Sequence, residues 1–159
     1  MKQKLYVETS VVGYLTSWPS RDIVVAARQQ ITRQWQKRKD HFQLFTSDAV
    51  IEEAGAGDSE AAADRLTALA ELPLLEIDEE VLSVATELMS SVPLPERASV
   101  DAVHIAVSVI HAMDYLLTWN CTHIANAALR PRIESVCGAL GFSAPIICTP
   151  EELMENLTP

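Results

Sequence analysis

The chain has 159 residues, of which 48% are hydrophobic and 21% charged, with a formal net charge of −10. This length favours one domain spanning residues 1–159, and three scattered cysteines without a CxxC pair argue against a disulfide scaffold or a zinc site. No apolar run approaches the roughly 18 residues of a membrane span, and the first predicted strand begins too near Met1 for a signal peptide. We therefore expect a soluble cytoplasmic protein with reduced thiols and no membrane partner.

The acidic net charge is unevenly distributed along the chain. Residues 1–47 hold 8 of the 12 lysines and arginines but only 3 of the 22 acids, a balance of +5, whereas residues 48–159 carry −15. A uniformly acidic surface would repel nucleic acid, but a divided surface can hold it in one region. The charge counts against a nucleic-acid substrate without excluding one.

In the first half of the chain, strands and helices are predicted to alternate. An apolar run at residues 4–7 predicts a buried strand, and a helix should start near residue 10. The segment 22–39 has apolar residues four apart, which predicts a long helix with one apolar stripe ending at Trp35. A second strand is expected at 43–47, where Ser47 is a suitable N-cap for a helix at 48–54. 

The second half continues the alternation. Another helix should follow Ser59 and end before Pro73, and residues 74–77 predict a third strand. Asp78 is expected to cap the next helix, 79–91, and a further helix is predicted from residue 99 to 113. The remaining predicted strands are 115–119 and, as a candidate fifth, 146–148. Short apolar strands alternating with helices predict an α/β fold with a mostly parallel sheet covered on both faces.

Several oxygen-bearing side chains follow predicted strands or lie near helix starts. Glu8 follows the first strand, Glu52 and Glu53 follow the second, Asp101 lies early in its helix, and Asn120 follows the 115–119 strand. In a parallel sheet, ligands bind outside the carboxyl ends of the strands. Carboxylates gathered there repel one another unless a cation lies between them, and hard oxygen ligands suit Mg²⁺ or Mn²⁺.

Each of these residues also has a purely structural interpretation. Glu8 and Asp101 can favour helix N-termini, one of the two glutamates can be an ordinary solvated acid, and Asn120 can be a turn residue. His104, three residues after Asp101, fits a packed core histidine better than a ligand. The hypothesis of a metal site depends on several of these residues converging.

Four segments resemble the motif blocks of PIN-domain proteins, and the similarity is greatest to bacterial toxin ribonucleases of the VapC type. The segments are YVETSVVGYL, TSDAVIEE, DAVHIAVS and LLTWNCTHIAN, in this order over residues 5 to about 126. The resemblance implies a three-layer α/β/α sandwich and a Mg²⁺- or Mn²⁺-dependent endoribonuclease. It also implies a homodimer, and a small antitoxin protein as partner if the chain is a toxin.

The resemblance assigns the catalytic and metal-binding positions to Glu8, Glu53, Asp101 and Asn120. Glu52 is the alternative to Glu53, and Thr118 and His123 match polar positions around the last site. Two positions depart from the family pattern. Glu8 is one methylene longer than the usual aspartate, and Asn120 lacks the charge of the aspartate that many members carry. Both departures are compatible with one bound ion and also with an inactive relative.

Basic residues in the 22–39 segment are candidate RNA contacts, because phosphate contacts supply most sequence-independent affinity. The candidates are Arg28, Arg33, Lys37, Arg38 and Lys39. The alternative is that they form a solvated helix face. For the whole chain, the leading hypothesis is a metal-dependent ribonuclease, and the alternatives are a catalytically silent protein-interaction module and, less favoured, a metal-dependent phosphatase.

Overall fold

A parallel sheet forms the centre of the molecule, which is known here from a computed structural model that describes residues 1–155. The last four residues of the predicted domain lie outside this part. The sheet contains β1 (Gln3–Val7), β2 (Phe42–Ser47), β3 (Leu74–Leu75), β4 (Tyr115–Leu117) and β5 (Ile146–Cys148). Their order is β3-β2-β1-β4-β5, and each neighbouring pair is parallel. The predicted parallel sheet is confirmed.

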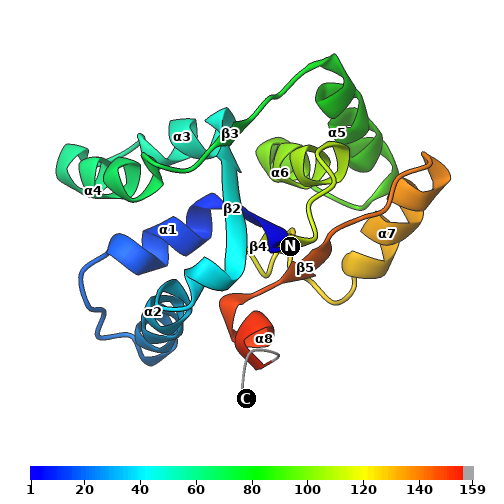
Figure 1. Cartoon of the computed structure of the whole chain (residues 1–159). Helices are drawn as coiled ribbons and strands as arrows, with labels where there is room; N and C mark the ends of the chain where they lie inside the picture. Colours follow the sequence, from blue (N-terminus) through cyan, green and yellow to red (C-terminus); the bar gives the residue numbers. More distant parts are fainter. Residues whose placement is uncertain (156–159) are drawn as a thin grey trace.

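Helices cover both faces of this sheet. They are α1 (Thr9–Thr16), α2 (Ile23–Gln36), α3 (Asp48–Ala54), α4 (Ser59–Leu69), α5 (Glu79–Ser91), α6 (Ser99–Ile110), α7 (Arg130–Ala139) and α8 (Pro150–Glu155). Two short 3-10 helices, η1 (Lys39–His41) and η2 (Glu96–Ala98), complete the described elements. In Figure 1, α1 and α2 lie on one side of the sheet and α5, α6 and α7 on the other. This arrangement confirms the three-layer α/β/α sandwich.

The most deeply buried elements are the central strand and the helix against it. In β1, Leu5 and Tyr6 are fully buried and Val7 nearly so, because this strand has neighbours on both edges and helices on both faces. Helix α6 buries Ala102 and the continuous run from His104 to Val109, seven of its twelve residues. The packing around β1 and α6 therefore holds the buried polar side chains of both elements in fixed positions.

Several predicted boundaries and caps differ from the structure. Helix α6 ends at Ile110 rather than at residue 113. Ala112 has a left-handed backbone conformation with φ of 52°, and a residue in this conformation cannot be part of a right-handed helix. Asp58, not Ser59, caps α4, whereas Asp78 caps α5 as predicted, with its carboxylate accepting from the Val81 amide at 3.0 Å. Helices α7 and α8 were not predicted at all.

The sheet changes direction beside β1, and this location positions the candidate site. From β1 the chain builds β2 and β3 on one side and then β4 and β5 on the other. Ligands of open α/β sheets bind at such a point, outside the carboxyl ends of the strands. Glu8 directly follows β1, and Thr118 directly follows β4. The two residues therefore lie at the edge of the sheet where the strand order reverses.

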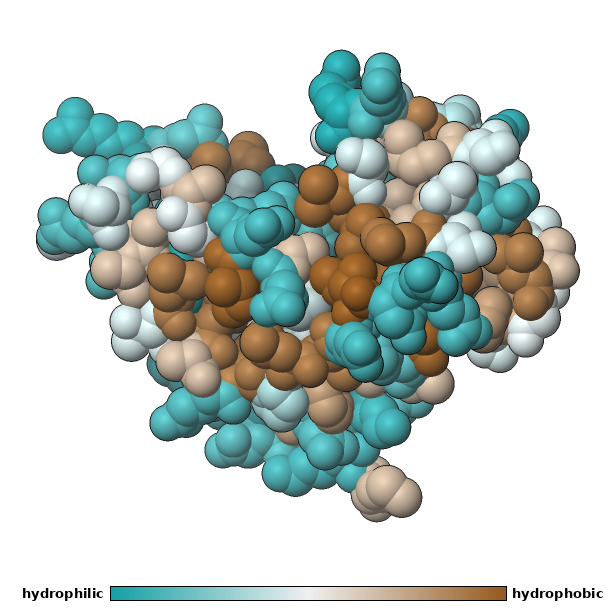
Figure 2. Space-filling view, turned by 90° about the horizontal axis from the view of Figure 1, so that it is seen from above, coloured by the Kyte–Doolittle hydropathy of each residue, from teal (hydrophilic) through white to brown (hydrophobic). Residues whose placement is uncertain are grey.

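The surface is mixed in character. Figure 2 shows hydrophobic surface in the middle of the face seen from above, with hydrophilic residues around it. Large hydrophobic side chains that are exposed in the structure include Ile23, Val24, Leu74 and Leu82. Within residues 1–155, no helix combines the length and the apolar character that crossing a membrane requires.

Candidate metal centre

Glu8 is buried at the start of α1, with only 4% of the residue exposed. Its Oε2 accepts hydrogen bonds from the Ser10 amide at 3.1 Å, from the Ser10 hydroxyl, and from Thr118 Oγ1 at 2.7 Å. Ser10 in turn accepts from the Trp119 amide at 2.8 Å, which ties the start of α1 to the end of β4. Glu8 therefore caps a helix, as its structural interpretation predicts, and all three donors converge on one of its two oxygens.

Glu53 approaches Glu8 from the end of α3. Its Oε1 accepts from Thr9 Oγ1 at 2.7 Å and from His104 Nε2 at 2.6 Å. The ligand atoms of Glu8, Glu53 and His104 all lie within 4.8 Å of one another, close enough to surround one cation. Glu52, the alternative to Glu53, is exposed and does not belong to this group.

The pKa of Glu53 reflects these contacts. Partial burial is the largest single effect and raises the pKa of its carboxyl, but the interactions with the His104 ring and the Thr9 hydroxyl together lower it by more. The net result is a pKa below the usual range, although the side chain is 37% exposed. Glu53 is therefore ionised at neutral pH, as a cation ligand must be.

Asp101 and Asn120 lie in the adjoining part of the same hydrogen-bond network. Asp101 Oδ2 is 2.9 Å from His123 Nδ1, and Asn120 Oδ1 accepts from the His123 amide at 3.0 Å, the turn-capping contact of its structural interpretation. The Asn120 amide donates to Thr118 Oγ1 at 2.9 Å, and Thr118 leads to Glu8. Among the described residues, Asp101 is not part of the compact three-residue group.

The structure thus brings Glu8 and Glu53 together directly and connects Asp101 and Asn120 to them through Thr118 and His123. Sequence reasoning treated His104 as a core residue. It is fully buried, but its ring contacts Glu53 as well as the core. The sequence signal for a role of His104 in the site was its position one helical turn after Asp101. Other site residues not predicted from the sequence are Tyr6, Thr9, Ser10 and Ser47.

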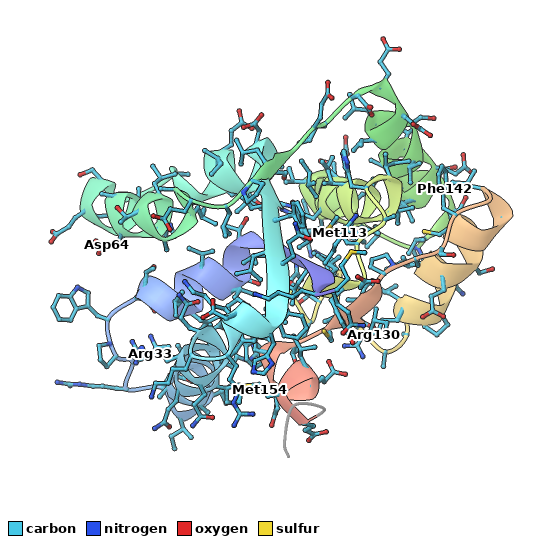
Figure 3. All side chains as sticks on the ribbon, in the orientation of Figure 1. Arg33, Asp64, Met113, Arg130, Phe142 and Met154 are labelled. Carbon is cyan, nitrogen blue, oxygen red and sulfur yellow. The ribbon has the colours of Figure 1, made fainter. Side chains whose placement is uncertain are left out.

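The candidate RNA-contacting residues have different environments. The Arg28 guanidinium lies 5.1 Å from the Trp119 ring centroid and 5.9 Å from that of Tyr14, so it is held beside the loop that carries Asn120. Arg33, labelled on α2 in Figure 3, donates to the Ser17 carbonyl at 3.2 Å. Lys37 and Lys39 are exposed, and Arg38 is half-buried. Two aromatic rings therefore orient Arg28 near the site.

A parallel α/β sandwich with carboxylates at its order-reversal point is an arrangement that can hold a divalent cation. The family model described as PIN domain matches residues 5–120, most of the chain. The chain therefore belongs to the PIN-domain family, whose members are generally nucleases that use divalent metal. Comparison with curated proteins finds no match.

Proposed function

We propose that this chain is a divalent-metal-dependent endoribonuclease and the toxin of a type II toxin–antitoxin pair. The observation that carries the proposal is the approach of Glu8, Glu53 and His104 to within 4.8 Å in a member of the PIN-domain family. Two carboxylates at this separation repel each other, and a cation between them would remove the repulsion.

The donor set fits Mg²⁺ or Mn²⁺. Glu8, Glu53, Asp101 and Asn120 supply hard oxygen atoms, the type of ligand that both ions prefer. Because the donors from Ser10 and Thr118 all converge on Glu8 Oε2, the other oxygen is left for an ion. A bound ion would orient a water and offset charge on a phosphate oxygen. In this proposal, Thr118 and Ser10 fix the Glu8 carboxylate through their hydrogen bonds, and His123 orients Asp101.

RNA binding is proposed for the basic residues Arg28, Arg33, Lys37, Arg38 and Lys39. Arg28 has the strongest support, because its stacking on Trp119 fixes a planar group of N–H donors beside the site. A homodimer and an antitoxin partner follow from the same proposed function. The hydrophobic surface in Figure 2 supports a protein partner, since apolar area is available there for burial.

Cleavage of total cellular RNA with Mg²⁺ or Mn²⁺ tests the proposal, with Asp101→Asn and Asp114→Asn as matched variants. Asp114 is exposed and accepts from the Lys4 amide at 2.7 Å, before β4 and so at the opposite end of the sheet. We expect Asp101→Asn to abolish cleavage and weaken metal binding, while Asp114→Asn retains both. No cleavage by the parent chain with either ion, or full cleavage by Asp101→Asn, would refute the proposal.

The alternative is a catalytically silent PIN-fold interaction module. The observation that favours it is the engagement of two site residues in local contacts, Asp101 with His123 and Asn120 with the turn that follows it. If the parent protein fails to bind metal but captures a protein partner, this alternative replaces the ribonuclease.

A further inference from the structure

A chain of buried hydrogen bonds leads from the candidate site into the core. His104 Nε2 contacts Glu53 Oε1 at 2.6 Å, and the other ring nitrogen, Nδ1, lies 2.8 Å from the Tyr6 hydroxyl. The Tyr6 hydroxyl is 2.7 Å from Ser47 Oγ. Tyr6, Ser47 and His104 are all fully buried. The three residues come from β1, the end of β2, and α6, and Glu53 comes from α3.

For a neutral His104 ring, the acceptor at one end fixes the direction of every hydrogen bond in this series. Because a carboxylate only accepts, the hydrogen on the His104 ring must be on Nε2. In the neutral ring Nδ1 then accepts from the Tyr6 hydroxyl, which leaves the Tyr6 oxygen to accept from Ser47. The Tyr6 hydroxyl is thereby the donor that fixes the His104 tautomer.

We propose that His104 is a positioning residue that holds the Glu53 carboxylate at the metal site, and that Tyr6 and Ser47 fix the His104 tautomer for this purpose. The inference rests on the proposed metal site. Glu53 needs such support because it lies at the end of the seven-residue helix α3 and its side chain is 37% exposed. An exposed glutamate samples many rotamers, and binding an ion would otherwise have to restrict them.

This role differs from direct coordination by His104. A coordinating nitrogen offers its lone pair to the ion, whereas Nε2 here carries the hydrogen that Glu53 accepts at 2.6 Å. Hydrogen-bonded partners behind metal ligands orient those ligands, and their loss weakens metal affinity by roughly 10- to 100-fold. The Tyr6 hydroxyl is separated from Glu53 by the imidazole ring, so an effect of Tyr6 on metal affinity must pass through His104.

Two other buried hydroxyl groups provide controls for the variants of Tyr6 and Ser47. Thr46 precedes Ser47 on β2, is also fully buried, and donates its hydroxyl to the Val7 carbonyl instead. Ser108 lies one turn beyond His104 on α6, is fully buried, and donates to the backbone carbonyl of His104 rather than to its ring. Removal of either hydroxyl therefore costs a buried hydrogen bond but leaves the side-chain hydrogen bonds between Ser47, Tyr6, His104 and Glu53 in place.

The experiment measures Mn²⁺ affinity from the electron paramagnetic resonance signal of the free ion. We expect Tyr6→Phe to weaken binding about tenfold and Ser47→Ala about threefold, while Thr46→Val and Ser108→Ala bind as the parent does. If the parent binds Mn²⁺ and all four variants bind equally tightly, the positioning role of His104 is wrong. If the parent itself binds no Mn²⁺, the proposed function fails as well.

A second measurement detects the tautomer of the His104 ring directly. The ¹⁵N chemical shifts of the histidine rings in the metal-free protein report which nitrogen carries the hydrogen, and His104→Gln assigns the signal. We expect the Nε2–H form for His104. The Nδ1–H form, or coupling of a His104 nitrogen to bound Mn²⁺, would overturn the inference.

Discussion

Addition of Mn²⁺ or Mg²⁺ should raise the thermal stability of this protein, and the size of the effect can be worked from the Glu8–Glu53 pair. At 4.8 Å, the upper limit of the separation between their ligand atoms, two carboxylates repel by about 3.5 kcal/mol at an effective dielectric constant of 20 and by about 0.9 kcal/mol in bulk water. Since Glu8 is buried and Glu53 is 37% exposed, solvent screens the pair only in part, and the repulsion is of the order of these values. Ion binding to the folded state removes it.

An ion present at 100 times its dissociation constant adds about 2.7 kcal/mol to the free energy of unfolding. For a chain of this length, 1 kcal/mol corresponds to about 2–4 °C in melting temperature, so we expect a rise of roughly 5–11 °C. Differential scanning fluorimetry or calorimetry over a metal titration measures this rise. An unchanged melting temperature up to millimolar metal would refute the proposed metal site.

Glu8→Gln is the variant that locates the effect. Without metal, the loss of repulsion is opposed by weaker hydrogen bonds from Ser10 and Thr118, since a neutral acceptor costs about 1 kcal/mol for each of three bonds. The two terms nearly cancel, so the metal-free melting temperature should change little while the metal-induced rise disappears. Asp78→Asn is the control, because Asp78 also caps a helix with its carboxylate but lies on α5. A full metal response in Glu8→Gln would exclude Glu8 from the site.

Three further outcomes are expected. Arg28→Gln should weaken RNA binding and reduce the slope of the logarithm of the RNA association constant against the logarithm of the salt concentration by about 0.7. Arg132→Gln on α7 is the control and should change neither quantity. Equal effects of the two variants in filter binding would contradict a specific role for Arg28. In the native protein at pH 8, only the exposed Cys121 should react with iodoacetamide, since burial raises the pKa of Cys148 to about 12; mass spectrometry showing alkylated Cys148 would contradict this. Burial is the largest single effect on the pKa of Glu152 and raises it, but the hydrogen bonds and charge of Arg130 and the hydrogen bonds of Thr149 together lower it by more. Its stabilisation is thus present above the unfolded-state pKa and lost as pH falls through the folded-state pKa, so Glu152→Gln should be less stable than the parent in urea at pH 7 but not at pH 3.

The central architecture could be predicted from the sequence because it depends on local patterns. The apolar runs at β1, β2 and β4 and the helices between them identify a parallel sheet, and such a sheet requires its carboxyl ends to meet at one edge. The approach of Glu8 to Glu53 follows from this geometry. Helices α7 and α8 were missed because α7 has only two buried residues, Ile133 and Cys137, and α8 has six residues, so neither presents a strong apolar stripe.

The polar contacts of the site could not be predicted, because their partners are distant in the sequence. His104 is 98 residues from Tyr6 and 51 from Glu53, so no local pattern separates a packed core histidine from one that orients a ligand. Ser47 is a second case in which a distant partner replaces a predicted local contact. It occupies the predicted N-cap position of α3, but makes no side-chain capping hydrogen bond because its hydroxyl is engaged with the Tyr6 hydroxyl at 2.7 Å.

Glu8 combines the structural and the functional interpretations of the same residue. N-caps are normally short side chains such as serine or aspartate, and a glutamate there has one methylene more than such a cap needs. Glu8 accepts from the Ser10 amide with Oε2 while its carboxylate still reaches the Glu53–His104 group. One oxygen stabilises the start of α1, and the carboxylate as a whole supplies charge to the site. The departure from a shorter aspartate is therefore compatible with the metal site that we propose, because the added length would let one side chain serve both as a buried helix cap and as a cation ligand.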